Sequence, residues 1–425
     1  MNNPITGALC ALLCAALAHA ARSETLEPRQ AARTSTVAFS AETRVRYDTQ
    51  HNVMLRSGED QSRALLRAVV GADWRPRRGL RFYAEMGTGQ ADATTSLGAN
   101  FENDASLQQL FVDAQAGSGD GILGAVVGRQ EFSEGPCQLI SVSDGPNLHR
   151  SWNGVRLYAR AQRGRIDAFD FRATRLRPGS FDETVDSGER LQGLSASYLL
   201  GDGEAQDDIV VEPFWFRTVQ PVNGGTPGRD RRDTHGARVV VPHGRFRADW
   251  TIARQTGRRL DREVDAWAVF AVHSVLLADT APKPRLTARI DVASGGSGAR
   301  SFNPLYASSS YIGEAQFLGL TNLLLVTPGA SFTPSRTTTV SFEYGVARRM
   351  SEDDAVYAAQ KRPYAATRLV RGRTIGAVAR ATAVWKASDR LKVAANLEHL
   401  GAGDVLERAG LSSSTYGHVS ATWRY

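Results

Sequence analysis

Apolar and polar side chains alternate along most of the chain, in segments of roughly ten residues separated by turn-forming residues. One segment places Leu286, Ala288, Ile290 and Val292 on one parity and Arg285, Thr287, Arg289 and Asp291 on the other. Successive side chains of a strand face opposite sides, so each segment predicts a strand with one apolar and one charged face. A helical period of about 3.6 would scatter these arginines around the axis.

The connections between these segments alternate between long and short. We expect them at 48–62, 75–79, 87–106, 117–123, 131–151, 161–165, 177–190, 201–207, 217–233, 242–244, 255–263, 279–284, 293–317, 327–336, 347–373, 386–390 and 399–415. Alternating loop lengths and an even strand number are typical of a transmembrane barrel and not of a soluble sandwich. The predicted fold is therefore all-β: a single transmembrane antiparallel β-barrel of about 18 strands, with short periplasmic turns and long extracellular loops. The segments near 208–217 and 318–326 are apolar on both parities and indicate strands least clearly.

The two ends of the chain carry localisation signals. An apolar run followed by Ala18-His19-Ala20 predicts a signal peptide over residues 1–20. We expect an N-terminal periplasmic segment over 21–35 and the barrel over 36–425, in the bacterial outer membrane. Only Cys137 remains after cleavage, so an internal disulfide is excluded. The last residues alternate and end on Tyr425, like the C-terminal strand through which the barrel-assembly machinery recognises its substrates.

Composition narrows the class of protein further. The chain has 425 residues, of which 42% are hydrophobic, and a formal net charge of +7. This apolar content disfavours a disordered chain, and beyond residue 20 charges interrupt every apolar run before the ~18 to 20 residues that a spanning helix needs. Lys occurs only at positions 283, 361, 386 and 392, so 47 of the 51 basic residues are Arg, whose planar side chain binds carboxylates and phosphates bidentately.

The charged parity must face the lumen if the apolar parity faces lipid, because a charge on the lipid face costs up to ~2 to 4 kcal/mol. An Arg-lined lumen attracts anions and lets a long polyanion slide between many weak sites. Alternatively, arginines and carboxylates pair across strands and only hold the wall in place. The predicted substrate-binding residues of the lumen are Arg44, Arg46, Arg67, Arg81, Glu85, Arg129, Glu131, Arg156, Arg160, Arg172, Arg245, Arg247, Arg285, Arg289 and Asp291.

Three blocks of sequence resemble the alginate export family of outer-membrane porins. They are Val-Gly-Arg-Gln-Glu-Phe at 127–132, Ser-Val-Ser-Asp-Gly-Pro-Asn-Leu-His-Arg-Ser-Trp-Asn-Gly-Val-Arg at 141–156, and Phe-Asn-Pro-Leu-Tyr at 302–306, which continues with Tyr-Ile-Gly-Glu-Ala at 311–315 and Leu-Thr-Asn-Leu at 320–323. The resemblance implies a monomeric barrel with an arginine-rich constriction that exports an anionic uronate polysaccharide without ATP. Arg129 and Arg156 lie within matching blocks, whereas Cys137 and Gln138 stand where the resemblance predicts a basic residue.

The predicted function is passive export of an alginate-like polyuronate, and the alternative is a general anion-preferring porin for small acidic solutes. An enzyme is disfavoured because no nucleophile motif, P-loop or dinucleotide fingerprint occurs and the eight His are scattered. We therefore expect no catalytic residue, metal or cofactor. Besides the cargo, the expected partners are outer-membrane lipid and lipopolysaccharide, which the charge run at 229–233 could contact in a predicted outer loop, and a periplasmic export scaffold. Nucleic acid is not expected, because no aromatic residues interleave that run.

Overall fold

The structure is a computed structural model that describes residues 35–93, 97–118, 121–201, 208–222, 228–297, 299–308 and 310–425. The predicted signal peptide, and all of the periplasmic segment except its last residue, lie outside these ranges. The first barrel strands are β1 (Thr36–His51), β2 (Gln61–Arg77), β3 (Leu80–Ala93), β4 (Asn103–Ser118), β5 (Gly121–Gln130), β6 (Trp152–Ala161), β7 (Gly164–Arg175), β8 (Thr184–Leu200) and β9 (Ile209–Pro221). The remaining ones are β10 (Arg229–His243), β11 (Phe246–Arg259), β12 (Arg262–Leu276), β13 (Arg285–Ala293), β14 (Leu323–Ser335), β15 (Thr338–Arg348), β18 (Thr374–Lys386), β19 (Leu391–Ala402) and β20 (Ser414–Arg424).

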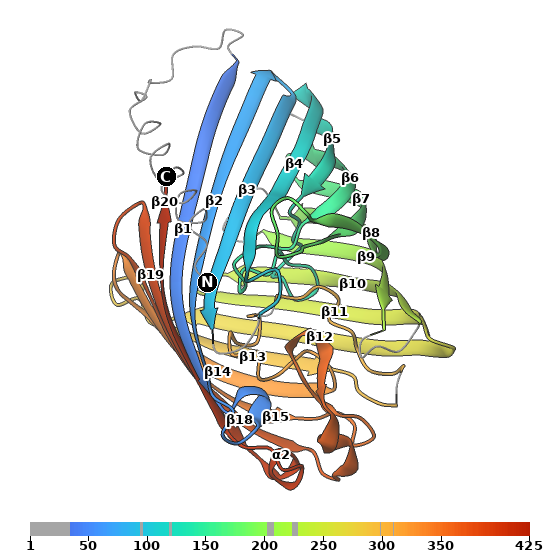
Figure 1. Cartoon of the computed structure of the whole chain (residues 1–425), viewed down its shortest axis with the longest axis vertical. Coiled ribbons are helices and arrows are strands. Elements are labelled where there is room, and N and C mark those ends of the chain that lie inside the picture. The colour runs from blue at the N-terminus through green and yellow to red at the C-terminus, as the bar shows by residue number, and fades with distance from the viewer. Residues whose placement is uncertain are drawn as a thin grey trace.

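These strands form one closed antiparallel barrel (Figure 1). Each strand pairs with the next in the sheet, and β1 closes the ring against β20 from Glu42–Arg424 to His51–Thr415. The sheet has 18 strands, which confirms the predicted fold. Short turns, such as 78–79, 162–163 and 336–337, share one end with the start of β1 and the end of β20, and most of the longer loops lie at the other end. In the described ranges, no helix is long and apolar enough to cross a membrane.

Several predicted boundaries were wrong, and the connection expected at 327–336 is only the two residues 336–337. The connection expected at 255–263 is only the two residues 260–261, and the charge run at 229–233 lies in β10 and not in a loop. The strand expected at 318–326 begins only at Leu323, because Leu318 and Leu320, each 3% exposed, pack inside the barrel as part of a loop. Apolar residues on both parities thus belong to a buried loop here, whereas the segment near 208–217 with the same pattern forms strand β9.

The two faces of the sheet differ as the alternation requires. On β13, Leu286 and Ile290 are 47% and 36% exposed on the outer face, while Asp291 on the inner face is fully buried. The same outward parity exposes Trp250 and Ile252 on β11 and Val419 and Trp423 on β20. An apolar outer band with aromatic residues is what a lipid-facing surface needs.

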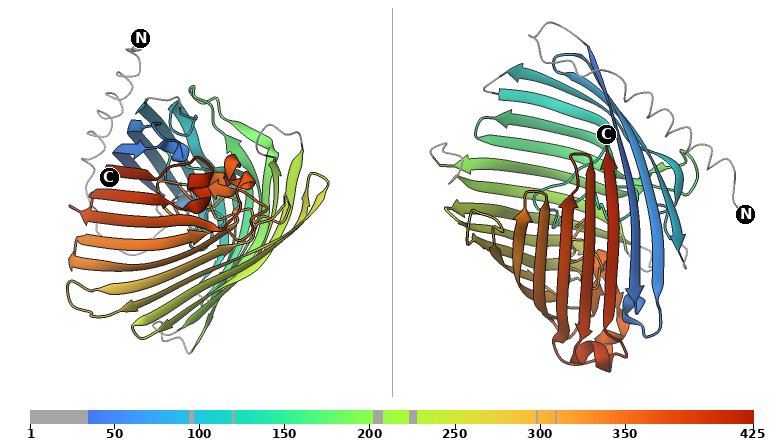
Figure 2. Two further views of the ribbon diagram at one scale, coloured as in Figure 1. Left: turned by 90° about the horizontal axis from the view of Figure 1, so that it is seen from below. Right: turned by 90° about the vertical axis from the view of Figure 1, so that its left-hand side faces the viewer.

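Long loops fold into the barrel and form a hydrophobic core there. The loops at 131–151, 294–322 and 349–373 all contribute, and the last holds the small hairpin β16 (Val356–Ala358) and β17 (Arg362–Tyr364) with the helices η2 (Ala359–Lys361) and η3 (Ala365–Leu369). Trp152 is fully buried and meets Tyr306 edge-on, with ring centroids 4.7 Å apart. The remaining helices are η1 (Val53–Leu55) and α2 (Asp404–Arg408). Seen from the loop end, these segments lie within the ring of strands (Figure 2, left).

Candidate functional site

Inside the barrel, the loop at 131–151 contacts strands β1 and β2. Arg44 and Arg67 point inward from directly opposite positions of these strands, and both bind the Asp144 carboxylate, at 3.3 Å and 2.6 Å. Arg44 also donates to the carbonyl oxygens of Asp144 and Pro146, at 2.7 Å and 2.6 Å. Two buried guanidinium groups on the wall therefore hold the tip of an inserted loop.

A second loop reaches the same place through Arg46. Its guanidinium lies 3.1 Å from Asp48 and 3.6 Å from Glu314 of the loop at 294–322, and it donates to the Tyr416 hydroxyl. Glu314 also lies 3.1 Å from His418 on β20, and its backbone N–H donates to Glu398 on β19. Both inserted loops are thus attached to the wall by charged groups around Arg44, Arg46 and Arg67.

His149 links the two ends of the loop at 131–151. One ring nitrogen lies 2.7 Å from Glu131 and the other 2.8 Å from Asp144. Burial opposes the charged imidazolium, but these hydrogen bonds outweigh it and raise the pKa of His149 to about 9. Burial likewise opposes ionisation of Asp144, but the His149 hydrogen bond and the charges of Arg67 and Arg44 hold its pKa well below the usual range. At neutral pH His149 is therefore a cation and Asp144 an anion.

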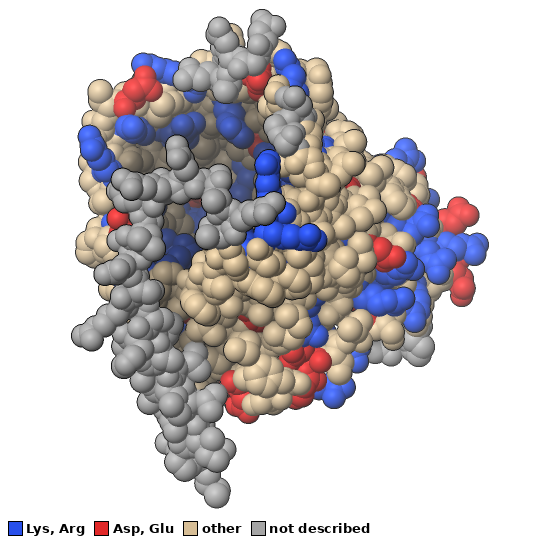
Figure 3. All heavy atoms as spheres, turned by 90° about the horizontal axis from the view of Figure 1, so that it is seen from above, with Lys and Arg blue, Asp and Glu red and all other residues tan. Residues whose placement is uncertain are grey.

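Arginines without acidic partners gather at the turn end of the lumen. Arg160, Arg247 and Arg285 occupy inward positions next to the turns at 162–163, 244–245 and 277–284. In the described part of the chain no carboxylate lies within ion-pair distance of any of them. Arg160 stacks 4.9 Å over the Tyr158 ring, and Arg285 donates to the Ser274 hydroxyl at 3.2 Å. A view from this end shows a hollow with basic side chains on its wall (Figure 3).

The other inward residues are paired along the wall. Arg81 lies 3.0 Å from Asp73, and Glu85 accepts from the Tyr83 hydroxyl at 2.7 Å. Arg289 lies 3.2 Å from Asp291 and donates to the Tyr311 carbonyl oxygen at 3.0 Å. Arg156 lies 3.9 Å from Asp167 and over the Phe132 ring. For these residues, cross-strand and loop pairing accounts for much of the charge.

The prediction that Arg129 lines the lumen was wrong. On β5 it shares the outward parity of Leu123 and Val127, which are 67% and 51% exposed. It donates to the Leu107 carbonyl oxygen and Glu183, both at 2.7 Å, and to Asn153 at 3.0 Å. At the loop end, β5 stops at Gln130 and β6 starts only at Trp152, so the chain at 176–183 takes their place beside β4. The contacts of Arg129 close the wall at this position.

The preceding residue in the sequence block, Gly128, has φ +129°, and a Cβ there would meet the Leu110 carbonyl oxygen at 2.3 Å. This position requires glycine because β5 approaches β4 closely. The block therefore matches a structural seam in the wall.

Arg172 and Arg245 also lie outside the lumen. Arg172 is exposed on the outer face of β7, directly opposite Arg190 of β8, and shares the parity of the exposed Ile166. Arg245 lies in a two-residue turn, binds Asp279 at 2.9 Å and has a side chain 58% exposed, so it belongs to the rim. Strand parity explains the first correction and the turn boundary the second.

A cavity of about 650 Å³ lies at the loop end, between the inserted loops and the wall. Its lining includes Arg150, Asp230, Arg259 and Lys361. Asp230 lies 3.7 Å from Arg259 and 3.9 Å from Lys361, so acidic and basic groups are mixed here. Burial, followed by the Arg232 charge, lowers the pKa of Lys361 to about 7.

Sequence reasoning missed the loop residues that complete the site. Asp144 and His149 lie in the block at 141–156, but no strand period assigns them a face. Glu314 lies in the block at 311–315, which is equally outside the alternating pattern. The available signal was the unusual Asp-Gly-Pro-Asn turn at 144–147 inside a long connection, which is typical of a loop with a defined shape.

Comparisons with known proteins identify a family and similar folds. The family model described as alginate export matches residues 35–420. The comparison with curated proteins gives no match.

Similar solved structures include outer-membrane porins of Pseudomonas aeruginosa. OpdQ has a TM-score of 0.62 and 11% identity, covering 92% of this chain and 98% of its own. OpdO has a TM-score of 0.62 and 13% identity, covering 92% and 97%. OccK2 (OpdF), solved in complex with glucuronate, has a TM-score of 0.58 and 10% identity, covering 91% and 96%. At such identities the likeness shows the fold alone.

Proposed function

Since this chain belongs to the alginate export family and folds as an outer-membrane porin, we propose that it passes an anionic, alginate-like polyuronate from the periplasm to the exterior by passive diffusion. The observation that carries the proposal is the order of basic groups along the lumen. Unpaired Arg160, Arg247 and Arg285 stand at the turn end, and the buried cluster of Arg44, Arg46 and Arg67 lies further inside.

The first group attracts and orients a polyanion. Outer-membrane barrels place their short turns in the periplasm, so this mouth faces the compartment from which the cargo comes. Basic groups on a low-dielectric wall raise the local concentration of an anionic solute. Because none of the three arginines is neutralised by a described carboxylate, their field reaches the solution.

The second group supplies exchangeable partners. Arg44 and Arg67 hold Asp144 and backbone carbonyl oxygens of a loop, and a uronate carboxylate offers the same acceptor geometry. We infer that sugar carboxylates replace the loop groups one at a time as the polymer advances. Exchange between similar partners keeps each step shallow, which a sliding substrate requires.

Reversal potentials across a planar bilayer with a KCl gradient test the anion preference. Wild-type channels should be anion-selective, and the double change Arg247→Glu and Arg285→Glu should reduce or invert the selectivity. Arg348→Glu is the matched control, because Arg348 is exposed on the outer face of β15. Cation selectivity of the wild type would refute the proposal.

A general porin for small acidic solutes is the second candidate. The inserted loops narrow the lumen, and the similar porin OccK2 was solved with glucuronate, a single uronate unit. Liposome swelling with monomeric uronate, set against current block by polyuronate, distinguishes the two. Rapid swelling without polymer block favours the small-solute channel, and block favours the export channel.

A further inference from the structure

The outer face of the barrel changes character near the loop end of β10, β11 and β12. On β11, Trp250 and Ile252 are 44% and 60% exposed, as expected for lipid contact. The next outward positions toward the loop end are Arg254, Thr256 and Arg258. On β12, the exposed Trp267 is likewise followed, in the direction of the loop end, by Asp265 and Glu263.

This charged zone lies just beyond the aromatic residues, on the side of the long loops. Aromatic girdles mark the membrane interfaces of such barrels, and long loops face the exterior. The zone is therefore level with the headgroups of the outer leaflet. The long β11–β12 hairpin, which closes in the two-residue turn at 260–261, therefore extends beyond the hydrocarbon. Its charged outward residues are tolerated only in such an environment.

Two arginines in this zone are left without an acidic partner. Arg254 is neutralised by Asp265 at 3.0 Å, and Asp233 on β10 is bound by Arg217 at 2.8 Å. Arg231 and Arg258 lie directly opposite each other across β10 and β11. In the described part of the chain neither forms an ion pair, although Glu263 stands opposite Arg258 on β12.

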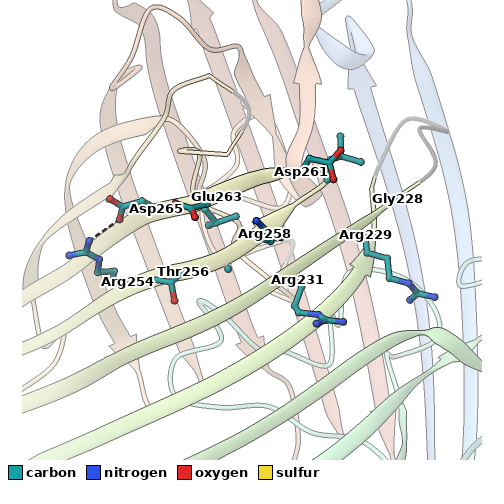
Figure 4. Close-up of a pocket in the computed structure, with 12 residues that line it drawn as sticks. Gly228, Arg229, Arg231, Arg254, Thr256, Arg258, Asp261, Glu263 and Asp265 are labelled. Atoms are coloured by element: carbon teal, nitrogen blue, oxygen red, sulfur yellow. Dashed lines mark ion pairs between the residues drawn. The ribbon is translucent and has the colours of Figure 1, made fainter.

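Two like charges at directly opposed positions destabilise a sheet unless an anion lies between them. Both side chains are exposed on the outer face. They line a groove of about 870 Å³ together with Arg229, Arg254 and the three acidic residues Asp261, Glu263 and Asp265 (Figure 4). The pair thus has the charge, the exposure and the space to receive an anionic group from outside the barrel.

We propose that Arg231 and Arg258 bind a phosphate of the outer-leaflet glycolipid, lipopolysaccharide. Guanidinium groups bind phosphate through paired, charge-assisted hydrogen bonds, and a phosphate between the two relieves their repulsion. The acyl chains of the same molecule would cover Trp250 and Ile252, which are exposed on the same face of β11 further from the loop end. Glu263 and Asp265 on the far side disfavour an extended polyuronate, which would bring further carboxylates against them.

Lipid A binding to the detergent-purified full-length protein tests this site, with native mass spectrometry as the readout. Wild-type protein should retain lipid A, and Arg231→Gln with Arg258→Gln should weaken retention by about tenfold or more, since hydrogen bonds to a charged group are lost. Arg348→Gln, on the outer face of β15, is the control and should retain lipid A fully. Heat-modifiable gel mobility verifies that each barrel is folded.

Competing probes identify the chemistry of the ligand. Dephosphorylated lipid A should bind no better to wild type than to the double variant, and inorganic phosphate or polyuronate should compete only weakly. Equal retention by wild type and double variant would overturn the proposal, as would full competition by either soluble anion. Channel selectivity should be unchanged in the double variant, so this outcome is separable from that of the export proposal.

Discussion

At the scale of single residues, Asp144 is the anion that attaches the inserted loop to the wall. We predict that Asp144→Asn raises single-channel conductance and makes openings more frequent. The change removes the carboxylate that Arg44 and Arg67 share, so that, among the described residues, Arg67 keeps only Glu42 as an acidic partner and Arg44 keeps only the loop carbonyl oxygens. Asp265→Asn, which removes an exposed ion pair on the outer face, is the matched control. Unaltered conductance in Asp144→Asn would show that the loop is held by other contacts.

His149 makes the same attachment dependent on pH. Its pKa is raised from 6.5 for the free side chain to about 9, so its bound imidazolium contributes fully below about pH 6.5 and is lost as the pH rises through about 9. Arg67, Glu131 and Asp144 surround it. We predict that current fluctuations increase between pH 8 and pH 10 in single-channel recordings. In His149→Gln they should be present at neutral pH and change little with pH.

The face of the sheet on which a side chain lies could be predicted from the alternation along its own strand. Arg285, Arg289 and Asp291 were assigned to the interior by alternation and occupy inward positions. Arg129 and Arg172 share the parity of exposed apolar neighbours on their own strands, and a strict count would have placed them outside. Alternation places a side chain on a face, but it does not say which carboxylate neutralises that side chain.

At the scale of elements, the short strands β5 and β6 leave a seam that Arg129 fills. We predict that Arg129→Ala lowers the free energy of unfolding by about 3 kcal/mol, since its partner Glu183 stays buried without a counter-charge. Urea unfolding followed by tryptophan fluorescence measures this. Anion selectivity should not change, because the side chain is outside the lumen. A selectivity change without loss of stability would place Arg129 in the conduction path.

The inserted loops could not be predicted as elements. Strand periodicity is a local property, whereas a loop such as 294–322 takes its conformation from contacts distant in sequence, including Glu314 with Arg46 and Tyr306 with Trp152. Leu318 and Leu320 are buried in the core for this reason, and they were assigned to a strand because no local feature separates a buried loop from a buried strand.

At the scale of the whole molecule, the strand number followed from counting connections and did not need accurate boundaries. Seventeen connections fix eighteen strands even when each end moves by several residues, and closure of β1 on β20 requires an even number for antiparallel pairing throughout. The interior was harder to predict, because a barrel of this size leaves a channel unless loops fill it. Here three loops occupy much of the lumen.

The two ends of the channel differ in charge, and this asymmetry predicts a directional effect. At the turn end, Arg160, Arg247 and Arg285 have no described acidic partner, whereas at the loop end Asp230 lies close to Arg259 and Lys361. Polyuronate added to the turn side of oriented channels should therefore block the current at a lower concentration than polyuronate added to the loop side.

The salt dependence of the block tests whether this difference between the two sides is electrostatic. Because the screening length falls from about 10 Å at 0.1 M to about 3 Å at 1 M, high KCl should remove most of this difference if it arises from electrostatic attraction. Changing Arg160, Arg247 and Arg285 together to Gln should remove it at low salt, and Arg348→Gln should preserve it. Equal block from both sides at low salt would mean that the unpaired arginines do not guide the polymer, and that the buried cluster around Arg67 alone determines entry.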